Sequence, residues 1–157
     1  MSNAEITAEI RNEPFFAGLD EPVLQYLGSH ATRQVLPKGN LLFRQGDAAD
    51  AFYMLLGGEI LVEIPAITGP SLEIQRLGQG QVLGWSWLIS PYRWTFQARA
   101  EEDTEVLAFD GAAILAHCEE NPDFGYALLK RFSALMSERL EAARRRMMDE
   151  WNPPGFA

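Results

Sequence analysis

Short runs of strand-forming residues, each ended by a turn signal, recur between residues 32 and 109 and constrain the fold more than any other feature of the chain. The clearest is a hairpin pattern, in which Gly57-Gly58 separates an apolar run at 51–56 from an alternating run at 59–64. The pattern predicts strands at residues 34–36, 41–44, 51–56, 59–64, 72–77, 95–100 and 105–109. Strands this short, spaced about 8–12 residues apart, are typical of an all-β sandwich or barrel and not of βαβ units.

Helical patterns flank the predicted strands on both sides. Before them, a first short helix is expected to end before Pro14, and Asp20 is the expected N-cap of a second one that ends at Gly28. After them, Asp110 is the expected N-cap of a helix over residues 111–120.

The last element is expected to be a long helix over residues 123–150, because no proline interrupts this stretch. One side of it carries Leu128, Phe132, Leu135, Arg139 and Ala143. A helix of about seven to eight turns is too long for one small β-domain to cover. We therefore expect its distal half, around Leu140, Ala143, Met147 and Met148, to pack on another chain, which predicts a homodimer.

Charge and composition exclude several classes of function. The formal net charge is −9, whereas a nucleic-acid-binding surface needs a basic face. Cys118 is the single cysteine, which excludes an internal disulfide and a cysteine-ligated metal cluster. His30 and His117 are isolated in the sequence and no nucleophile–base pattern stands out, so we expect neither a metal site nor an enzyme. The sequence contains neither a membrane-spanning run nor a signal peptide, so a cytoplasmic protein is expected.

The candidate site lies in residues 78–100, which hold three glycines and three of the four tryptophans of the chain. A glycine-rich loop can turn its backbone N–H groups toward an anion, because glycine tolerates positive φ and close approach. Indole rings add flat apolar faces and one N–H donor each. This stretch therefore predicts a small-molecule pocket with an aromatic wall.

Four motifs resemble those of a known family. They are Pro14-Phe15-Phe16-Ala17-Gly18-Leu19, Phe43-Arg44-Gln45-Gly46-Asp47, Phe52-Tyr53-Met54-Leu55-Leu56-Gly57-Gly58-Glu59, and Arg99-Ala100 followed by Glu105-Val106-Leu107. With them the chain resembles the cyclic nucleotide-binding domain, the sensor module of the catabolite activator/FNR regulators and of cyclic-nucleotide-gated kinases and channels.

The resemblance implies a mainly β fold with flanking α-helices. Its core is a double-stranded β-helix (jelly roll) of about eight strands, with short N-terminal helices and a long C-terminal helix. It implies an N-terminal helical segment at 1–30, a cyclic nucleotide-binding-like β-roll at 31–110 and C-terminal helices at 111–151, all in one domain.

The loop cassette departs from the binding pattern that the resemblance implies. Family members that bind cyclic nucleotides have a glutamate after the cassette glycine, which holds the ribose 2′-hydroxyl, and a later arginine that pairs with the cyclic phosphate. An alignment without gaps from Gly84 to Arg99 puts Trp85 at the glutamate position and Trp94 at the arginine position. Arg93 is displaced by one residue, which on a strand turns its side chain to the opposite face unless a bulge re-aims it. Loss of the arginine–phosphate pair is expected to cost roughly 2–5 kcal/mol of binding free energy.

The candidate ligand-binding residues are Gly84, Trp85, Ser86, Trp87, Leu88, Arg93, Trp94 and Thr95. Three hypotheses remain open. The first is a stand-alone ligand-sensing regulatory module, whose effector is a cyclic nucleotide or an aromatic or apolar substitute and whose C-terminal helix signals to an unknown protein partner. The second is a ligand-free interaction or scaffold domain, with its pocket closed by its own tryptophans. The third is cAMP or cGMP binding through Arg93 and backbone amides.

Direct DNA binding is not expected, because the chain ends where the helix-turn-helix of the related regulators would begin.

Overall fold

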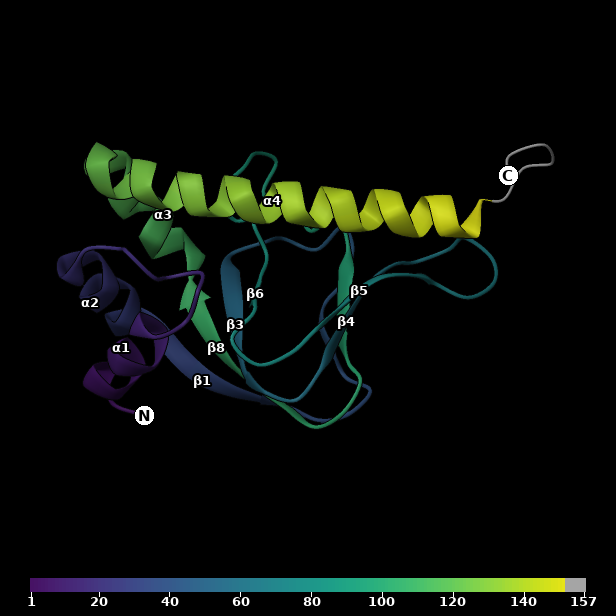
Figure 1. Cartoon of the computed structure of the whole chain (residues 1–157), viewed down its shortest axis with the longest axis horizontal. Coiled ribbons are helices and arrows are strands. Elements are labelled where there is room, and N and C mark those ends of the chain that lie inside the picture. Colours follow the sequence, from purple (N-terminus) through teal and green to yellow (C-terminus); the bar gives the residue numbers. More distant parts are fainter. Residues whose placement is uncertain (152–157) are drawn as a thin grey trace.

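The computed structural model describes residues 1–151, in which the alternating segments form eight strands and the flanking segments form four helices (Figure 1). The strands are β1 Ala31–Leu36, β2 Leu41–Phe43, β3 Ala51–Gly57, β4 Ile60–Ile64, β5 Leu72–Leu77, β6 Val82–Leu83, β7 Gln97–Ala100 and β8 Thr104–Asp110. The helices are α1 Asn3–Arg11, α2 Glu21–Ser29, α3 Gly111–Glu120 and α4 Pro122–Glu150. The predicted mainly β fold with short N-terminal helices and a long C-terminal helix is confirmed.

The strands form two antiparallel sheets, which enclose the interior of the roll. One sheet has the order β1-β8-β3-β6 and the other β2-β7-β4-β5. Leu55 and Val106 from the first sheet and Ile60 and Val62 from the second belong to one buried cluster. The hairpin predicted around Gly57-Gly58 is wrong, because β3 and β4 do not pair with each other. β3 belongs to the first sheet and β4 to the second, so the glycine turn crosses from one sheet to the other.

The outer face of the β1-β8-β3-β6 sheet is buried under the helices. A second buried cluster combines side chains of β3 and β8 with side chains of all four helices, among them Ile10, Leu27, Phe52, Met54, Leu107, Phe109, Ile114 and Phe132. This double burial explains why β3 is a continuous apolar run. Phe52 and Met54 enter the helical cluster, whereas Tyr53 and Leu55 enter the roll interior.

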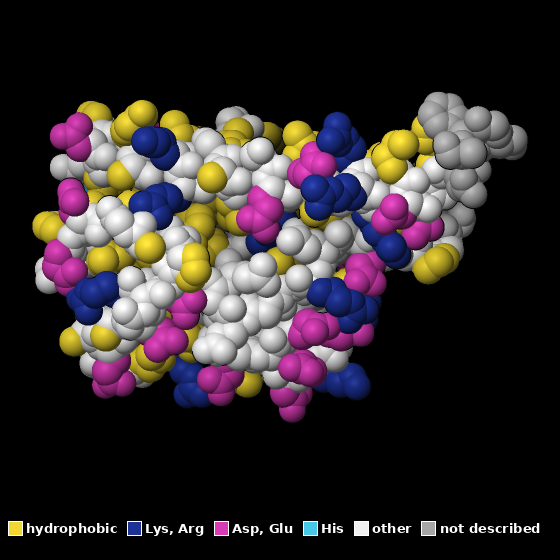
Figure 2. Space-filling view, in the orientation of Figure 1, with side chains coloured by type: hydrophobic (Ala, Val, Ile, Leu, Met, Phe, Trp, Pro, Cys, Tyr) yellow, Lys and Arg dark blue, Asp and Glu magenta, His cyan; other side chains and the backbone are white. Residues whose placement is uncertain are grey.

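The long helix α4 changes character along its length. Its first half contributes Phe124, Leu128, Phe132 and Leu135 to the helical cluster. Beyond Arg139 the large apolar side chains become exposed, and Leu140 is 72% accessible. The prediction for Ala143 is wrong, because this residue packs against the roll interior of its own chain. Figure 1 shows α4 running across the molecule from α3 past β5, and Figure 2 shows hydrophobic side chains along the outer edge that α4 forms.

The two histidines that are isolated in the sequence both stack on the ring of Tyr26. The ring centroids lie 4.1 Å apart for His30 and 3.8 Å apart for His117. Within residues 1–151, no group of three or more His, Cys, Asp or Glu side chains is arranged to hold a metal ion. In the same part of the chain, no helix has both the length and the hydropathy of a membrane span.

Candidate functional site

The cassette between β6 and β7 is built around Gly84. This residue has a φ of 103°, a conformation that glycine adopts without steric cost. A Cβ atom at this position would lie 2.7 Å from Cη2 of Trp94, so the indole rests directly against the glycine backbone. Both the backbone conformation and the close approach therefore require glycine here.

Trp94 is fixed by its ring and by its backbone. The indole is 5% exposed and stacks on Phe43, with ring centroids 3.7 Å apart and planes 9° apart. The Trp94 N–H donates to the carbonyl of Asp47 at 2.9 Å, and the Gly46 N–H donates to the carbonyl of Trp94 at 2.8 Å. The indole thus lies directly against the glycine loop for which the sequence predicts an anion site.

A small, apolar cavity remains beside this indole, within the roll. It leaves about 10 Å³ for the centre of a water molecule, which is room for roughly one water. Its lining residues are Phe43, Val62, Ile74, Leu83, Gly84, Trp85, Ser86, Trp94, Phe96 and Arg139. Of the eight residues that the sequence nominates, Gly84, Trp85, Ser86 and Trp94 line the cavity.

The other four nominated residues lie elsewhere. Trp87 and Leu88 pack in or against the helical cluster. Thr95 is exposed. Arg93 is exposed as well, and its Nη1 donates to the carbonyl of Gly46 at 3.0 Å. The loop therefore does not turn the Arg93 side chain back into the cavity.

Trp87 ties the cassette to the helices. Its side chain is 1% exposed, and its Nε1 donates to the carbonyl of Gly84 at 3.2 Å. The indole stacks on Phe52 of β3 and contacts Phe132 of α4 edge to face. In both pairs the ring centroids lie 5.1 Å apart. The two tryptophans differ in one respect: Trp85 packs against the helical cluster and also lines the cavity, whereas Trp87 is buried within that cluster and contacts α4.

Arg139 of α4 is a site residue that reasoning from the cassette missed. The sequence could have indicated it, because Arg139 lies on the apolar side of the long helix, where a charged residue is unusual. The residue is 3% exposed. Its Nη2 donates to the carbonyl of Val82 at 2.6 Å, two residues before Gly84, and its Nη1 contacts Oε1 of Glu138 at 3.0 Å.

The guanidinium of Arg139 is not fully satisfied by these contacts. Its Nε is buried and has no acceptor among residues 1–151. Burial lowers the pKa of Arg139 below its ordinary value, and the adjacent Glu138 carboxylate offsets part of that shift. Among the described residues that line the cavity, Arg139 supplies the formal charge.

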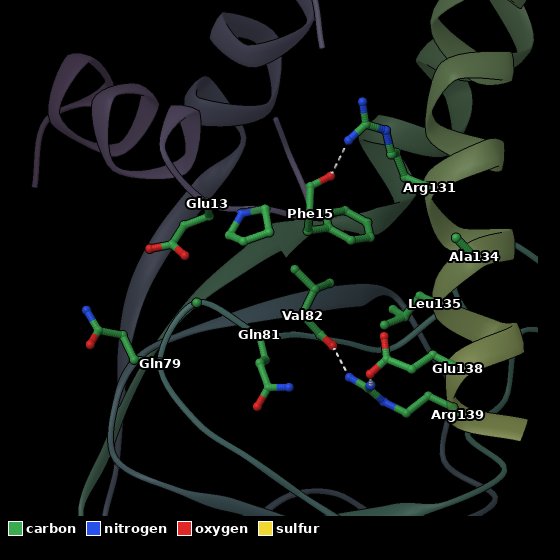
Figure 3. Close-up of a pocket in the computed structure, with 12 residues that line it drawn as sticks. Glu13, Phe15, Gln79, Gln81, Val82, Arg131, Ala134, Leu135, Glu138 and Arg139 are labelled. Carbon is green, nitrogen blue, oxygen red and sulfur yellow. Dashed lines mark hydrogen bonds and ion pairs between the residues drawn. The ribbon is translucent and has the colours of Figure 1, made fainter. Parts of the chain in front are cut away.

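An open groove of about 590 Å³ lies beneath α4, on the other side of Arg139 (Figures 2 and 3). It runs between the N-terminal segment, the turn before β6 and the helix. In Figure 3, Glu13 and Phe15 lie across the groove from Glu138 and Arg139. Arg131 closes the far end by donating from Nη1 to the carbonyl of Phe15 at 2.9 Å. Because Arg139 lines both spaces, it separates the groove from the apolar cavity.

Arg99, the third residue of β7, forms an ion pair with Glu63 of β4. Its Nη2 lies 3.1 Å from Oε2 of Glu63, whereas Glu101 is 3.9 Å away. Gln97 Nε2 also donates to Glu63, at 2.6 Å. Burial by itself would raise the pKa of Glu63, but the hydrogen bonds from Arg99 and Gln97 outweigh it and lower the pKa. This buried carboxylate braces β4 against β7 outside the cavity.

Comparisons with known proteins agree with this architecture. The family model described as "Cyclic nucleotide-binding domain" matches residues 33–121. The Cyclic AMP receptor protein of Thermus thermophilus is 28% identical over 134 residues, which cover 85% of this chain and 60% of the relative. The cAMP-activated global transcriptional regulator CRP of Escherichia coli is 27% identical over 122 residues, 77% of this chain and 56% of the relative. The chain thus spans less than two thirds of the length of these two relatives.

A solved structure adds the likeness of fold. It is a cyclic nucleotide-binding domain from Methylobacillus flagellatus, with a TM-score of 0.77 and 19% identity, and the match covers 98% of this chain and 86% of that one. The family model covers more than half of the 157 residues, from within β1 to just beyond the end of α3. The chain therefore belongs to the cyclic nucleotide-binding domain family.

Proposed function

We propose that this chain is a ligand-sensing regulatory domain whose cassette no longer takes a cyclic nucleotide by the usual contacts and which signals through α4. One observation carries the proposal: the Trp94 indole lies against Gly84 and fills the space before the glycine loop. The effector is then a molecule that can replace or rearrange an indole, and not a charged sugar phosphate.

The chemistry of the lining supports the exclusion of a cyclic phosphate. A phosphate placed against Gly84 would meet the Trp94 indole in place of the arginine fork that binds such groups well. Arg93, the nearest cation along the cassette, is already engaged with the carbonyl of Gly46 and is exposed. Arg139, the cation in the cavity lining, donates to the carbonyl of Val82, two residues before the loop. A phosphate buried at Gly84 with Trp94 in this position would therefore be unpaired, which carries a large desolvation cost.

Two contacts offer a route from the cassette to α4. Trp87 packs on Phe132, and the carbonyl of Val82 accepts from Arg139. A ligand that moves the cassette disturbs both contacts, and it shifts the helix only as far as it binds one arrangement better than the other. The distal half of α4 is the part whose surroundings would change.

A second copy of the chain is the proposed partner of that distal half. Leu140 and Met147 are exposed in the distal half, and the exposed Tyr126 and Leu129 continue the same helical face into the first half. Exposed apolar residues on one long helical face are the pattern of a coiled-coil seam. We therefore keep the homodimer as part of the proposal, with any further protein partner left open.

A ligand-free scaffold is the second candidate, and the size of the cavity favours it. Space for roughly one water is far below what a metabolite needs. In this alternative Trp85 and Trp94 are permanent core residues, and the domain acts through its surfaces alone.

Intrinsic fluorescence separates the two candidates. In a Trp151→Phe background the three remaining tryptophans all belong to the cassette. We expect at least one member of a panel of aromatic metabolites to shift the emission and raise the melting temperature, and cAMP and cGMP to do neither. A panel without any responding compound would establish the scaffold candidate instead. A response to cAMP that Arg93→Ala abolishes would establish nucleotide binding through Arg93.

A further inference from the structure

Arg139 presents a buried cation to an apolar cavity. Its side chain is 97% buried, given an exposed fraction of 3%, and its Nε has no acceptor among residues 1–151. Nη2 has two N–H donors and uses one carbonyl, that of Val82. Nε and Nη2 lie on the same edge of the guanidinium, so this edge combines an unpartnered Nε–H with an Nη2 that donates to Val82.

The counter-charge of Arg139 is largely exposed. Glu138, which contacts Nη1, is 58% exposed and belongs to the open groove. Figure 3 shows the Glu138 carboxylate on the groove side, beside the guanidinium. A buried cation is stabilised well only by a partner that is itself desolvated with good geometry. Arg139, which also lines the cavity, is therefore a buried cation whose carboxylate partner is not desolvated, and this charge balance favours a second, buried anion.

A purely structural role accounts for only part of the arrangement. The hydrogen bond to Val82 joins α4 to β6, but a single neutral donor would suffice for it. This hydrogen bond does not explain why the buried residue is an arginine, with a charged guanidinium. It also does not explain why Nε has no acceptor among residues 1–151. Both features are explained when a carboxylate occupies the guanidinium edge.

We propose that the cavity beside Trp94 takes a planar aromatic carboxylate, whose carboxylate group pairs with Arg139 and whose ring replaces the Trp94 indole on Phe43. The proposal rests on the sensing function proposed above and names the class of its effector. Phe43, Trp85 and Phe96 supply the aromatic walls, and Ser86 adds a hydroxyl. Since only about 10 Å³ is open beside the indole, binding requires Trp94 to swing out.

Benzoate and its neutral counterpart benzyl alcohol are the probes for this site. They share a ring and differ in charge, so their ratio of affinities isolates the contribution of Arg139. Trp94→Ala removes the competing indole and is expected to tighten the binding of both. In this variant benzoate is expected to bind about tenfold to a hundredfold more tightly than benzyl alcohol, as hydrogen bonds to a charged group allow. Calorimetry and the shift of melting temperature report the affinities.

Removal of the guanidinium tests the charge pairing. Arg139→Gln in the Trp94→Ala background is expected to abolish the preference for benzoate. Arg144→Gln is the matched control, because Arg144 lies on the same helix with a side chain that is 72% exposed and pairs with Glu141. It is expected to leave the preference unchanged. If Arg139→Gln does not fold, the affinities of benzoate and benzyl alcohol in Trp94→Ala still show whether the site prefers a carboxylate.

The outcomes separate this proposal from the sensing function. Equal binding of benzoate and benzyl alcohol, or binding of neither, would overturn the carboxylate assignment. If another aromatic compound then still shifts the emission of the wild-type chain, sensing stands without the carboxylate. If the preference for benzoate persists in Arg139→Gln, the anion lies elsewhere and the assignment is wrong.

Discussion

Trp94 and Gly84 restrain each other at the level of single atoms. The indole needs the absence of a Cβ at Gly84, and the glycine holds a φ of 103° that other residues adopt only under strain. Phe43 supports the opposite side of the indole at 3.7 Å. Closure of the pocket thus depends on the shape of three residues and not on any ion pair.

Gly84→Ala tests this mutual restraint. The positive φ is expected to cost about 1–3 kcal/mol of unfolding free energy. The contact of the new methyl group with the Trp94 ring is expected to add a further cost of about 1–3 kcal/mol.

A double-mutant cycle with Trp94→Ala separates the two costs. The steric part is expected to vanish in the double variant, whereas the backbone part persists, and chemical denaturation measures both. Additive effects would mean that the ring does not rest on the glycine.

The carboxylate of Glu63 gives a pH-dependent prediction. Its pKa is lower in the folded chain than the ordinary value of 4.5, because Arg99 and Gln97 outweigh the effect of burial. Its stabilising contribution is therefore complete above that value and is lost as the pH falls through the lower folded pKa. We expect the unfolding free energy to decline over this acidic range.

The comparison of Glu63→Gln with an exposed control checks the assignment. Glu63→Gln is expected to lose about 1–3 kcal/mol at neutral pH and to flatten the acidic decline. Glu102→Gln, at an exposed position, is expected to do neither. An acidic decline that is the same in wild type and Glu63→Gln would assign it to other groups.

For single residues, the sequence predicts which residue types form the site better than it predicts where their side chains point. It concentrates three tryptophans in the cassette, and the alignment of the resemblance places Trp94 where a phosphate ligand would be. It does not distinguish Trp94, which enters the roll, from Trp87, which enters the helical cluster, because the path of an irregular loop decides which way each ring points. The sequence did not predict Arg139 as a site residue, because its contact with the cassette depends on how α4 packs against β6.

At the scale of elements, α4 has two different halves. The half up to Leu135 is part of the helical cluster, and the half beyond Arg139 carries exposed Leu140 and Met147. The division falls at the residue that contacts Val82, so the helix passes from core to surface at the cassette. A shift of the cassette is thus expected to change the orientation of the distal half most.

A charged residue on the exposed face tests the proposed dimer. Leu140→Glu is expected to convert a dimer into a monomer, since it buries an unpaired charge in an apolar seam. Sedimentation velocity measures the change. Arg145→Gln alters the charge by the same amount on another side of the helix, where its side chain is 77% exposed, and is expected to leave the dimer intact. A wild-type chain that is monomeric at high concentration would remove this part of the proposal.

The sequence predicts elements well where periodicity is long. The strands β3, β4 and β5 and the full length of α4 follow from alternation, glycine turns and the lack of an internal proline. The pairing of β3 with β4 does not follow, because a glycine turn can join two strands of one sheet or lead from one sheet to another. β6 has two residues, too few for any period, and lies directly before the cassette. The start of β1 at Ala31 was missed by three residues, because its middle positions are exposed and polar.

At the scale of the whole molecule, the fold keeps the architecture of its family while the chemistry of the site changes. Two sheets enclose an interior that extends to the cassette, and the helical cluster joins that cassette to α4. In the proposed function, aromatic packing takes the place of the polar ligands that the family resemblance implies. A regulatory domain of this kind can keep its mechanical coupling while its effector class differs.

Restoration of the polar ligands tests that separation of coupling and specificity. Trp85→Glu combined with Trp94→Arg places in the cassette the two residue types that the family uses for the ribose and the phosphate. We expect the double variant to gain cAMP affinity over the wild type by at least about tenfold, through the arginine–phosphate pair. Trp85→Gln combined with Trp94→Gln opens the same space without the charges and serves as the control. Equal affinity in both variants would show that space, and not charge, limits binding.

The most direct measurement is a calorimetric titration of the wild-type chain with cAMP. Because the Trp94 indole fills the phosphate space and Arg93 points to Gly46, we predict no saturable heat at micromolar concentrations. Submicromolar binding with one site per chain would contradict the central claim that an indole has replaced the phosphate contact.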